Sequence, residues 1–273
     1  MNSKNLKQRI LSATIFLLIF VAGVFIHKII FAIVFSLFMI IALWEFYTLF
    51  EQKQIKPHKI IAIIFSLGLF IFTYLFAQNL IPTKLVFILP ALIFPIFAIE
   101  LLKKSKPLEN LAYTFLGIIY IAIPFSLFNL LVFPEVANNE YTYKIFAGFF
   151  MLIWSYDIGA YFVGSLIGKN LFFERISPKK TWEGTIGGGV VTLLVSVAIF
   201  YIFDILKIYD WIILSVIVSF GAVFGDLVES MFKRTLKIKD TGKIMPGHGG
   251  ILDRFDSAIF TAPFFVIYII LKF

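Results

Sequence analysis

Residues 29–50 read IIFAIVFSLFMIIALWEFYTLF, an apolar run whose single charged side chain is Glu45. About 20 residues of this kind are enough to cross the hydrocarbon core of a bilayer as one α-helix. The chain contains further apolar runs of similar length at 10–27, 59–78, 84–102, 108–133, 144–168, 184–203, 209–229 and 256–272. The sequence therefore predicts an all-α, polytopic integral membrane protein with about nine transmembrane helices.

The composition supports this fold class. Of 273 residues, 60% are hydrophobic, 15% are charged and 35 are Phe. A soluble domain is roughly 45–50% apolar and about 25% charged, so this chain has too little polar surface to cover a globule in water. Cysteine is absent, which excludes disulfides, a thiolate metal site and a Cys nucleophile.

The basic residues predict the topology. With the N-terminus in the cytoplasm and nine alternating spans, 19 of the 24 Lys and Arg residues fall on the cytoplasmic side, as the positive-inside rule requires. This bias also explains the net charge of +8 without a nucleic-acid partner.

We predict two long cytoplasmic loops, at about 169–183 and 230–255, and a division of the chain into two halves at the outer loop 133–143. Residues 1–133 would anchor and pack, and residues 144–273 would form the catalytic part.

Intramembrane carboxylates are costly and usually face a protein interior or a wet cavity. Asp157 lies in WSYDIGAYFVG (residues 154–164), where it shares a helical face with the small residues Ala160 and Gly164. It is either a site residue or a hydrogen-bonding group between helices.

The run GDLVESMFKR (residues 225–234) places Asp226, Glu229 and Lys233 on one face. It predicts either a site for a hard cation such as Mg²⁺ or, as the simpler alternative, a Glu229–Lys233 pair that ends the helix.

The segment 233–256 reads KRTLKIKDTGKIMPGHGGILDRFD and combines six cations, three carboxylates, one His and four glycines. Glycine allows backbone N–H groups to approach phosphate, and Arg and Lys neutralise it. Asp253 and Asp256 are three residues apart, and we expect Asp253 to meet Asp226 and form one metal site. His248 is a candidate phosphate donor or acid/base, with a solvated loop side chain as the alternative.

A second basic element is SPKKTWEG, residues 177–184, followed by Gly187–Gly189. We expect a helix to begin near Thr181 and Trp182. A helix N-terminus with adjacent lysines is a natural anion site, although Lys179 and Lys180 also fit a purely topological role. The glycine triplet does not follow a strand, so it favours close helix packing over a phosphate loop.

The segment from Ser230 to Asp256 resembles the signature of phosphatidate cytidylyltransferases, in the form S-x-x-K-R-x4-K-D-x-G-x2-M-P-x-H-G-G-x2-D-R-x-D. Met245 stands where that pattern usually has Leu, Ile or Phe. The Ser-Pro-Lys-Lys-Thr-x-Glu-Gly element and the Asp157-x-x-Ala-Tyr-x-x-Gly element are similar to the family in the same order. The motifs cover about residues 150–273, and the N-terminal half is similar only in having several apolar spans.

The resemblance implies transfer of the cytidylyl group of CTP to phosphatidate in the membrane bilayer. It also implies a homodimer in the bacterial cytoplasmic (inner) membrane, with its site on the cytoplasmic side. We assign Mg²⁺ to Asp226 and Asp253, with a second cation such as K⁺ beside it. The expected catalytic residues are Asp226, Asp253, Lys233, Arg234, His248 and Asp256. The expected substrate-binding residues are Lys179, Lys180, Thr181, Glu183, Glu229, Ser230, Lys239, Asp240, Arg254 and Asp157. Four acids, Glu183, Glu229, Asp240 and Asp256, are expected to orient the cations or reach metal-bound water.

Other functions remain as alternatives. A CTP-dependent polyprenol or phytol kinase, or a cytidylyltransferase for an ether-lipid phosphate, would use similar carboxylates and lysines, but the intact signature argues against them. An ion-coupled transporter would show pseudo-symmetric halves and polar groups near the midplane. Here the polar residues concentrate in one half of the chain and at one face.

Overall fold

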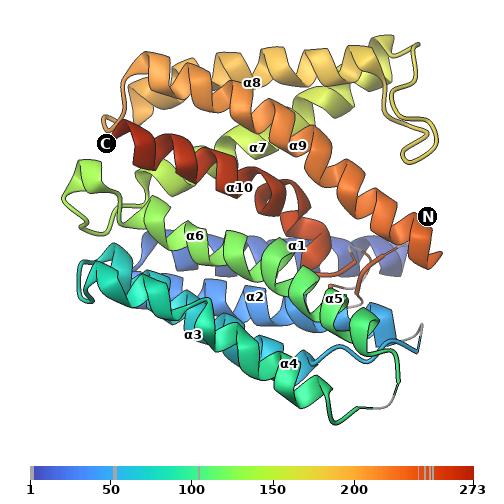
Figure 1. Ribbon diagram of the computed structural model, residues 1–273. Helices are drawn as coiled ribbons and strands as arrows, with labels where there is room; N and C mark the ends of the chain where they lie inside the picture. The colour runs from blue at the N-terminus through green and yellow to red at the C-terminus, as the bar shows by residue number, and fades with distance from the viewer. Residues whose placement is uncertain are drawn as a thin grey trace. The chain divides into compact units, whose positions relative to one another are not determined.

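The computed structural model describes residues 3–51, 54–103, 105–238, 240–242, 244–245, 247 and 249–273, with side chains from residue 8 onward (Figure 1). Its main helices are α1 (Ser3–Phe25), α2 (Lys28–Glu51), α3 (Lys59–Ala77), α4 (Phe94–Glu100), α5 (Pro107–Gly117), α6 (Ile123–Val132), α7 (Lys144–Ile167), α8 (Trp182–Ile202), α9 (Ile208–Leu236) and α10 (Leu252–Lys272). Within these described residues, nine stretches are long and apolar enough to cross a membrane. The predicted all-α, nine-span membrane fold is confirmed, and the cytoplasmic N-terminus stays a prediction.

Two of the spans are not single α-helices. The fourth, Thr83–Glu100, consists of 3₁₀ turns at Thr83–Ile88 and Ala91–Ile93 followed by α4. Pro82 directly precedes this span, and Pro90 and Pro95 lie within it. Proline lacks an N–H and clashes with the preceding turn, so one continuous α-helix does not form here. The fifth span joins α5 to α6 through a π-helical turn at Ile118–Ala122. That turn lies just before Pro124, which cannot donate to the preceding helical turn.

The chain forms two compact units, each described here by itself. Unit 1 comprises Met1–Leu130 and Asp240–Arg254, and unit 2 comprises Leu131–Lys239 and Phe255–Phe273. Unit 1 is built around aromatic side chains: Phe35 stacks on Phe31 with ring centroids 4.5 Å apart and meets Phe128 edge-on at 6.1 Å. Rings of this size bury much apolar surface and stabilise the packing of α2 against α6. The predicted anchoring and catalytic roles of the two halves stay predictions.

In unit 2, α8 lies beside both α7 and α9 (Figure 1). Glycines allow this close packing, because a Cβ atom at Gly187 would collide with Val163 and one at Gly188 would lie 3.0 Å from the Cβ of Ala160. The packing interpretation of these two glycines is confirmed. The outer faces of the helices carry exposed apolar side chains such as Leu194 and Tyr201, as expected for surfaces that lipid solvates.

Candidate active site

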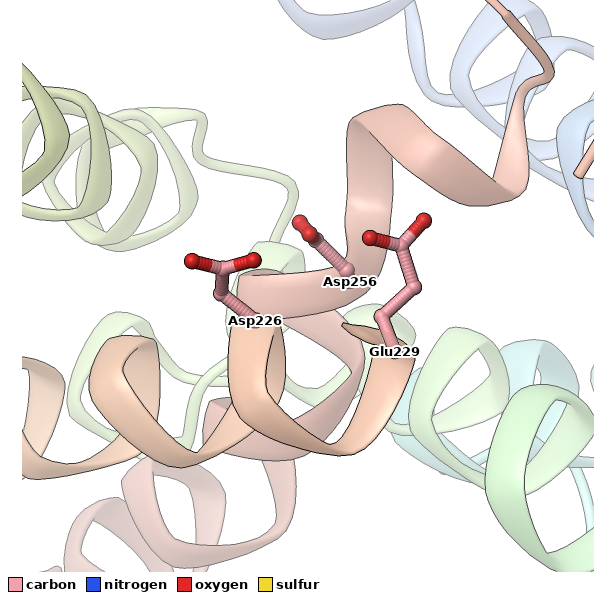
Figure 2. A group of neighbouring side chains, drawn as sticks. All are labelled: Asp226, Glu229 and Asp256. Atoms are coloured by element: carbon pink, nitrogen blue, oxygen red, sulfur yellow. The ribbon is translucent and has the colours of Figure 1, made fainter. Parts of the chain in front are cut away.

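Three carboxylates of unit 2 come together where α9 meets α10. Asp226 and Glu229 lie one helical turn apart on α9, and Asp256 projects from α10 toward them (Figure 2). One oxygen from each residue lies within 4.8 Å of the others. Glu229 is buried, whereas Asp226 and Asp256 are partly accessible. This arrangement confirms that Asp226 and Glu229 share a helical face.

Glycine brings the two helices close enough for this meeting. A Cβ atom at Gly225 would lie 2.8 Å from both the backbone oxygen of Asp256 and the Cα of Ser257, and one at Gly221 would collide with Thr261. The backbones of α9 and α10 therefore touch directly at Gly225. Asp256 reaches the carboxylates of α9 because no side chain separates the helices at this point.

Two lysines pair with this group, which we call the carboxylate cluster (Asp226, Glu229 and Asp256). Lys180 Nζ lies 2.7 Å from Asp226 Oδ2, and Lys233 Nζ lies 2.8 Å from Glu229 Oε2. The Ser230 hydroxyl donates to Asp226 Oδ1 over 3.4 Å. The Glu229–Lys233 pair considered from the sequence therefore forms within α9, but it accompanies the cluster rather than replacing it.

The cluster opens into a cavity of about 470 Å³ within unit 2. Its walls include residues from three motifs of the sequence: Asp157, then Lys179, Lys180 and Thr181 of one element, and Asp226. The remaining lining residues are Tyr156, Ala160, Tyr161, Gly164, Ser165, Ser177, Gly184 and Thr185. The structure thus brings the Asp157 element, the lysine element and Asp226 to one cavity. The cavity is lined by two carboxylates, Asp157 and Asp226, and by two cations, Lys179 and Lys180.

The loop before α8 is fixed by a small set of hydrogen bonds. The carboxylate of Glu183 accepts from the backbone N–H of Lys169 and of Asn170, each over 3.2 Å. The N–H of Phe172 donates to the Lys180 carbonyl over 2.7 Å. Glu183 therefore holds the backbone of the loop that presents Lys179 and Lys180. Its predicted role toward the cations or metal-bound water stays a prediction.

Thr181 begins α8 as the sequence predicts. Its hydroxyl oxygen accepts from the N–H of Gly184 over 3.1 Å, which satisfies one of the free donors of the first helical turn. On α9, the last turn carries Arg234, whose Nε donates to the carbonyl of Ile176 over 3.5 Å. This weak contact ties the end of α9 to the loop before α8.

The donor set of the carboxylate cluster fits a hard divalent cation. Mg²⁺ takes oxygen ligands and is usually held by one or two carboxylates, with waters and substrate phosphates as its other ligands. Three carboxylates whose oxygens lie within 4.8 Å of one another offer such ligands, and Asp226 also lines the cavity, from which waters and substrate phosphates can complete the coordination. Without a cation, the like charges repel one another at this distance.

The signature loop, which we define as residues 240–254, belongs to unit 1. The Asp253 carboxylate accepts from the N–H of Gly250 over 2.7 Å and from the N–H of Thr241 over 3.1 Å. Asp240 and Arg254 are exposed. Lys239 and His248 lie outside the described residues. Asp226 belongs to unit 2, so its pairing with Asp253 as one metal site stays a prediction.

The positions of several site residues were not predicted from the sequence. Glu229 and Asp256 were expected to orient cations, and the structure adds that they form one cluster with Asp226. Tyr156 and Thr185 line the cavity but were not singled out. Tyr156 precedes Asp157 directly and Thr185 lies one turn after Thr181, so helical periodicity around those two residues is the signal that points to them.

Comparisons with known proteins agree with this site. A model of the "Cytidylyltransferase family" matches residues 7–272. The phosphatidate cytidylyltransferase of Staphylococcus aureus (strain COL) is 35% identical over 271 residues, which cover 97% of this chain and 99% of that protein. The phosphatidate cytidylyltransferase of Bacillus subtilis (strain 168) is 37% identical over 270 residues, covering 95% and 96% of the two chains. These matches confirm the resemblance seen in the motifs, and the chain belongs to the cytidylyltransferase family.

Proposed function

We propose that the protein transfers the cytidylyl group of CTP to phosphatidate, which gives CDP-diacylglycerol and pyrophosphate. The observation that carries the proposal is the cavity in which Lys179, Lys180 and Asp226 meet beside the carboxylate cluster, at the end of a membrane-length helix. Relatives of nearly full length bear the name of this activity. They favour it over the lipid kinase and ether-lipid alternatives.

The chemistry follows from the charges of the substrates. A phosphate oxygen of phosphatidate attacks the α-phosphorus of CTP and forms a new P–O bond. The P–O bond between the α- and β-phosphates breaks, and its electron pair leaves with pyrophosphate. The nucleophile is already ionised, so the site needs no strong general base. Catalysis is therefore mainly positioning and neutralisation of negative charge.

Asp226, Glu229 and Asp256 would supply oxygens for Mg²⁺, with Asp253 as the further ligand expected from the sequence. When bound, the ion neutralises phosphate charge. Lys180 holds Asp226 and lines the cavity, so it can turn from the carboxylate to a phosphate oxygen. Lys179 and Asp157 line the same cavity and complete the binding surface for the triphosphate or the lipid head group. A second cation such as K⁺ would add to this neutralisation.

We place the protein in the bacterial cytoplasmic membrane as a homodimer, with its site on the cytoplasmic side. The excess of Lys and Arg in the predicted cytoplasmic segments supports the orientation. The bacterial relatives support the type of membrane. CTP would enter from the cytoplasm, and phosphatidate would enter from the inner leaflet.

The direct test is transfer of label from α-³²P-CTP to lipid by the purified protein with phosphatidate and Mg²⁺. Asp226→Asn, Asp253→Asn and Asp256→Asn are assayed beside the wild type, with thermal unfolding as the folding control. We expect labelled CDP-diacylglycerol from the wild type and a loss of at least about 100-fold in Asp226→Asn. A wild type that labels no lipid from phosphatidate, yet consumes CTP with a polyprenol, would refute the proposal in favour of the kinase.

A further inference from the structure

Glu45, an acidic residue inside the second span, binds the backbone of the signature loop. Its side chain is buried, with 5% of its surface exposed. Glu45 Oε2 accepts from the N–H of Leu252 over 3.0 Å. Leu252 is the first residue of α10. A carboxylate of α2 therefore caps the start of α10 from a position 207 residues away in the sequence.

The fit between Glu45 and the loop is tight on two sides. A Cβ atom at Gly242 or at Gly250 would collide with the carboxylate of Glu45. Both positions are glycine, so the loop backbone lies directly against the carboxylate. The same loop holds Asp253, whose own carboxylate accepts from Gly250 N–H and Thr241 N–H.

These contacts join into one chain of bonded groups. Glu45 fixes Leu252 and touches Gly250. Gly250 in turn donates to Asp253, which stands in the first turn of α10. The first N–H groups of a helix lack partners within the helix and favour a negative charge. A buried carboxylate there is stabilised and in turn fixes where the helix begins.

We infer that Glu45 is a positioning residue for the proposed cytidylyl transfer, which sets the signature loop and the first turn of α10 without touching substrate. The expected effect on kcat rests on the proposed function, whereas the effect of Glu45 on the loop structure rests on the contacts alone. Residues that orient the groups of a site typically contribute about 10- to 100-fold to activity. The N-terminal half then contributes to catalysis through one side chain as well as by packing.

A purely stabilising role is the competing explanation, and unit 1 offers a matched control. Glu100 is also buried, with 2% of its surface exposed, and it bonds to His58 and to Asn110. None of these described contacts involves residues 240–254. Glu100→Gln should therefore lower the unfolding temperature while each folded molecule keeps its turnover rate.

The first arm of the experiment is kinetic. Full-length Glu45→Ala, Glu45→Gln and Glu100→Gln are assayed for kcat and KM with CTP and phosphatidate in mixed micelles. We expect Glu45→Ala to lower kcat about 10- to 100-fold while KM changes by less than about threefold. Glu45→Gln keeps one oxygen acceptor and should restore part of kcat. A kcat in Glu45→Ala within about twofold of the wild-type value, after correction for folded protein, overturns the inference.

The second arm tests the contact by itself. Gly250→Ala should lower kcat in the wild type but add little in the Glu45→Ala background, because the collision is then gone. Gly249→Ala is the control. Gly249 has a φ of +87°, which strains any L-residue, so Gly249→Ala should lower kcat by the same factor in both backgrounds. Equal losses for Gly250→Ala in both backgrounds refute the contact.

The third arm needs no catalysis. Hydrogen–deuterium exchange should rise in peptides covering residues 240–254 in Glu45→Ala, and stay at the wild-type level there in Glu100→Gln. Unchanged exchange in Glu45→Ala overturns the inference. If the wild type transfers no label, the proposed function fails, and the exchange result still decides whether Glu45 positions the loop.

Discussion

Replacing Gly225 by Ala is expected to part α9 from α10 and to open the carboxylate cluster. The new Cβ would lie 2.8 Å from the Asp256 backbone oxygen and from the Ser257 Cα. These are backbone atoms, which cannot rotate away as the end of a long side chain can. Ordinary Cβ contacts lie at 3.4–4 Å, so the helices must separate by roughly 0.6 Å or more.

The magnitude follows from two opposing effects. Overpacking of this kind costs about 1–3 kcal/mol. The gain in helix propensity from Gly to Ala offsets about 1 kcal/mol of that cost. The net loss of unfolding free energy should therefore be about 0–2 kcal/mol. Activity should fall further, by about 10- to 100-fold, because Asp256 moves away from Asp226 and Glu229.

The assay is label transfer from α-³²P-CTP to phosphatidate as a function of Mg²⁺ concentration, with thermal unfolding in parallel. Gly189→Ala on α8 is the control, since the nearest atom to its Cβ would be Ser219 Oγ at 3.8 Å. That variant should gain about 0.5–1 kcal/mol of stability and keep its activity. A Gly225→Ala protein with the wild-type rate and the wild-type Mg²⁺ dependence would refute both the helix contact and the cluster as the metal site.

Three further predictions concern single side chains. Lys180→Met should lower kcat about 100-fold or more. It should change the unfolding free energy by about 1 kcal/mol or less, because the Lys180–Asp226 ion pair is partly exposed. The control, Lys169→Met in the same loop, should match the wild type in both assays. Thr181→Val removes the cap of α8 and should cost about 1 kcal/mol in chemical denaturation, and no loss would show that the cap is dispensable. Thr114→Val leaves the buried N–H of His58 without its 2.8 Å acceptor and should cost about 1–3 kcal/mol of unfolding free energy. A matching fall in turnover per folded molecule would contradict a purely structural role for this hydrogen bond.

The spans were predictable because a bilayer makes apolar length a strong constraint. The run 29–50 corresponds to α2, Lys28–Glu51, and the run 144–168 corresponds to α7, Lys144–Ile167. The interior of the fourth span was not predicted. Hydropathy counts apolar residues, whereas the conformation of this span depends on Pro82, Pro90 and Pro95, which remove backbone donors while the run stays apolar enough to cross a membrane.

The candidate site was predictable along each helix but not between helices. Spacing alone places Asp226 and Glu229 on one face of α9, and the structure agrees. That Asp256 lies beside Asp226 depends on how α9 and α10 cross, and this crossing depends on the backbone contact at Gly225. No local pattern records that contact, since a glycine in a span is equally compatible with several packing partners.

The groups that bond to a buried carboxylate distinguish a structural role from a chemical one better than the exposed fraction of its side chain does. Glu45 accepts from a backbone N–H group, which carries no net charge and cannot leave, so this carboxylate serves to fix the chain. Asp226, Glu229 and Asp256 instead face one another within 4.8 Å, an arrangement that is unfavourable unless cations offset it. Lys180 and Lys233 pair with two of the three, and both ammonium groups can exchange a carboxylate for a phosphate oxygen. A cluster that retains negative charge and is held by mobile cations is suited to take up a metal ion together with a polyphosphate, and the same residues would have little reason to lie together in a protein that only packed its helices.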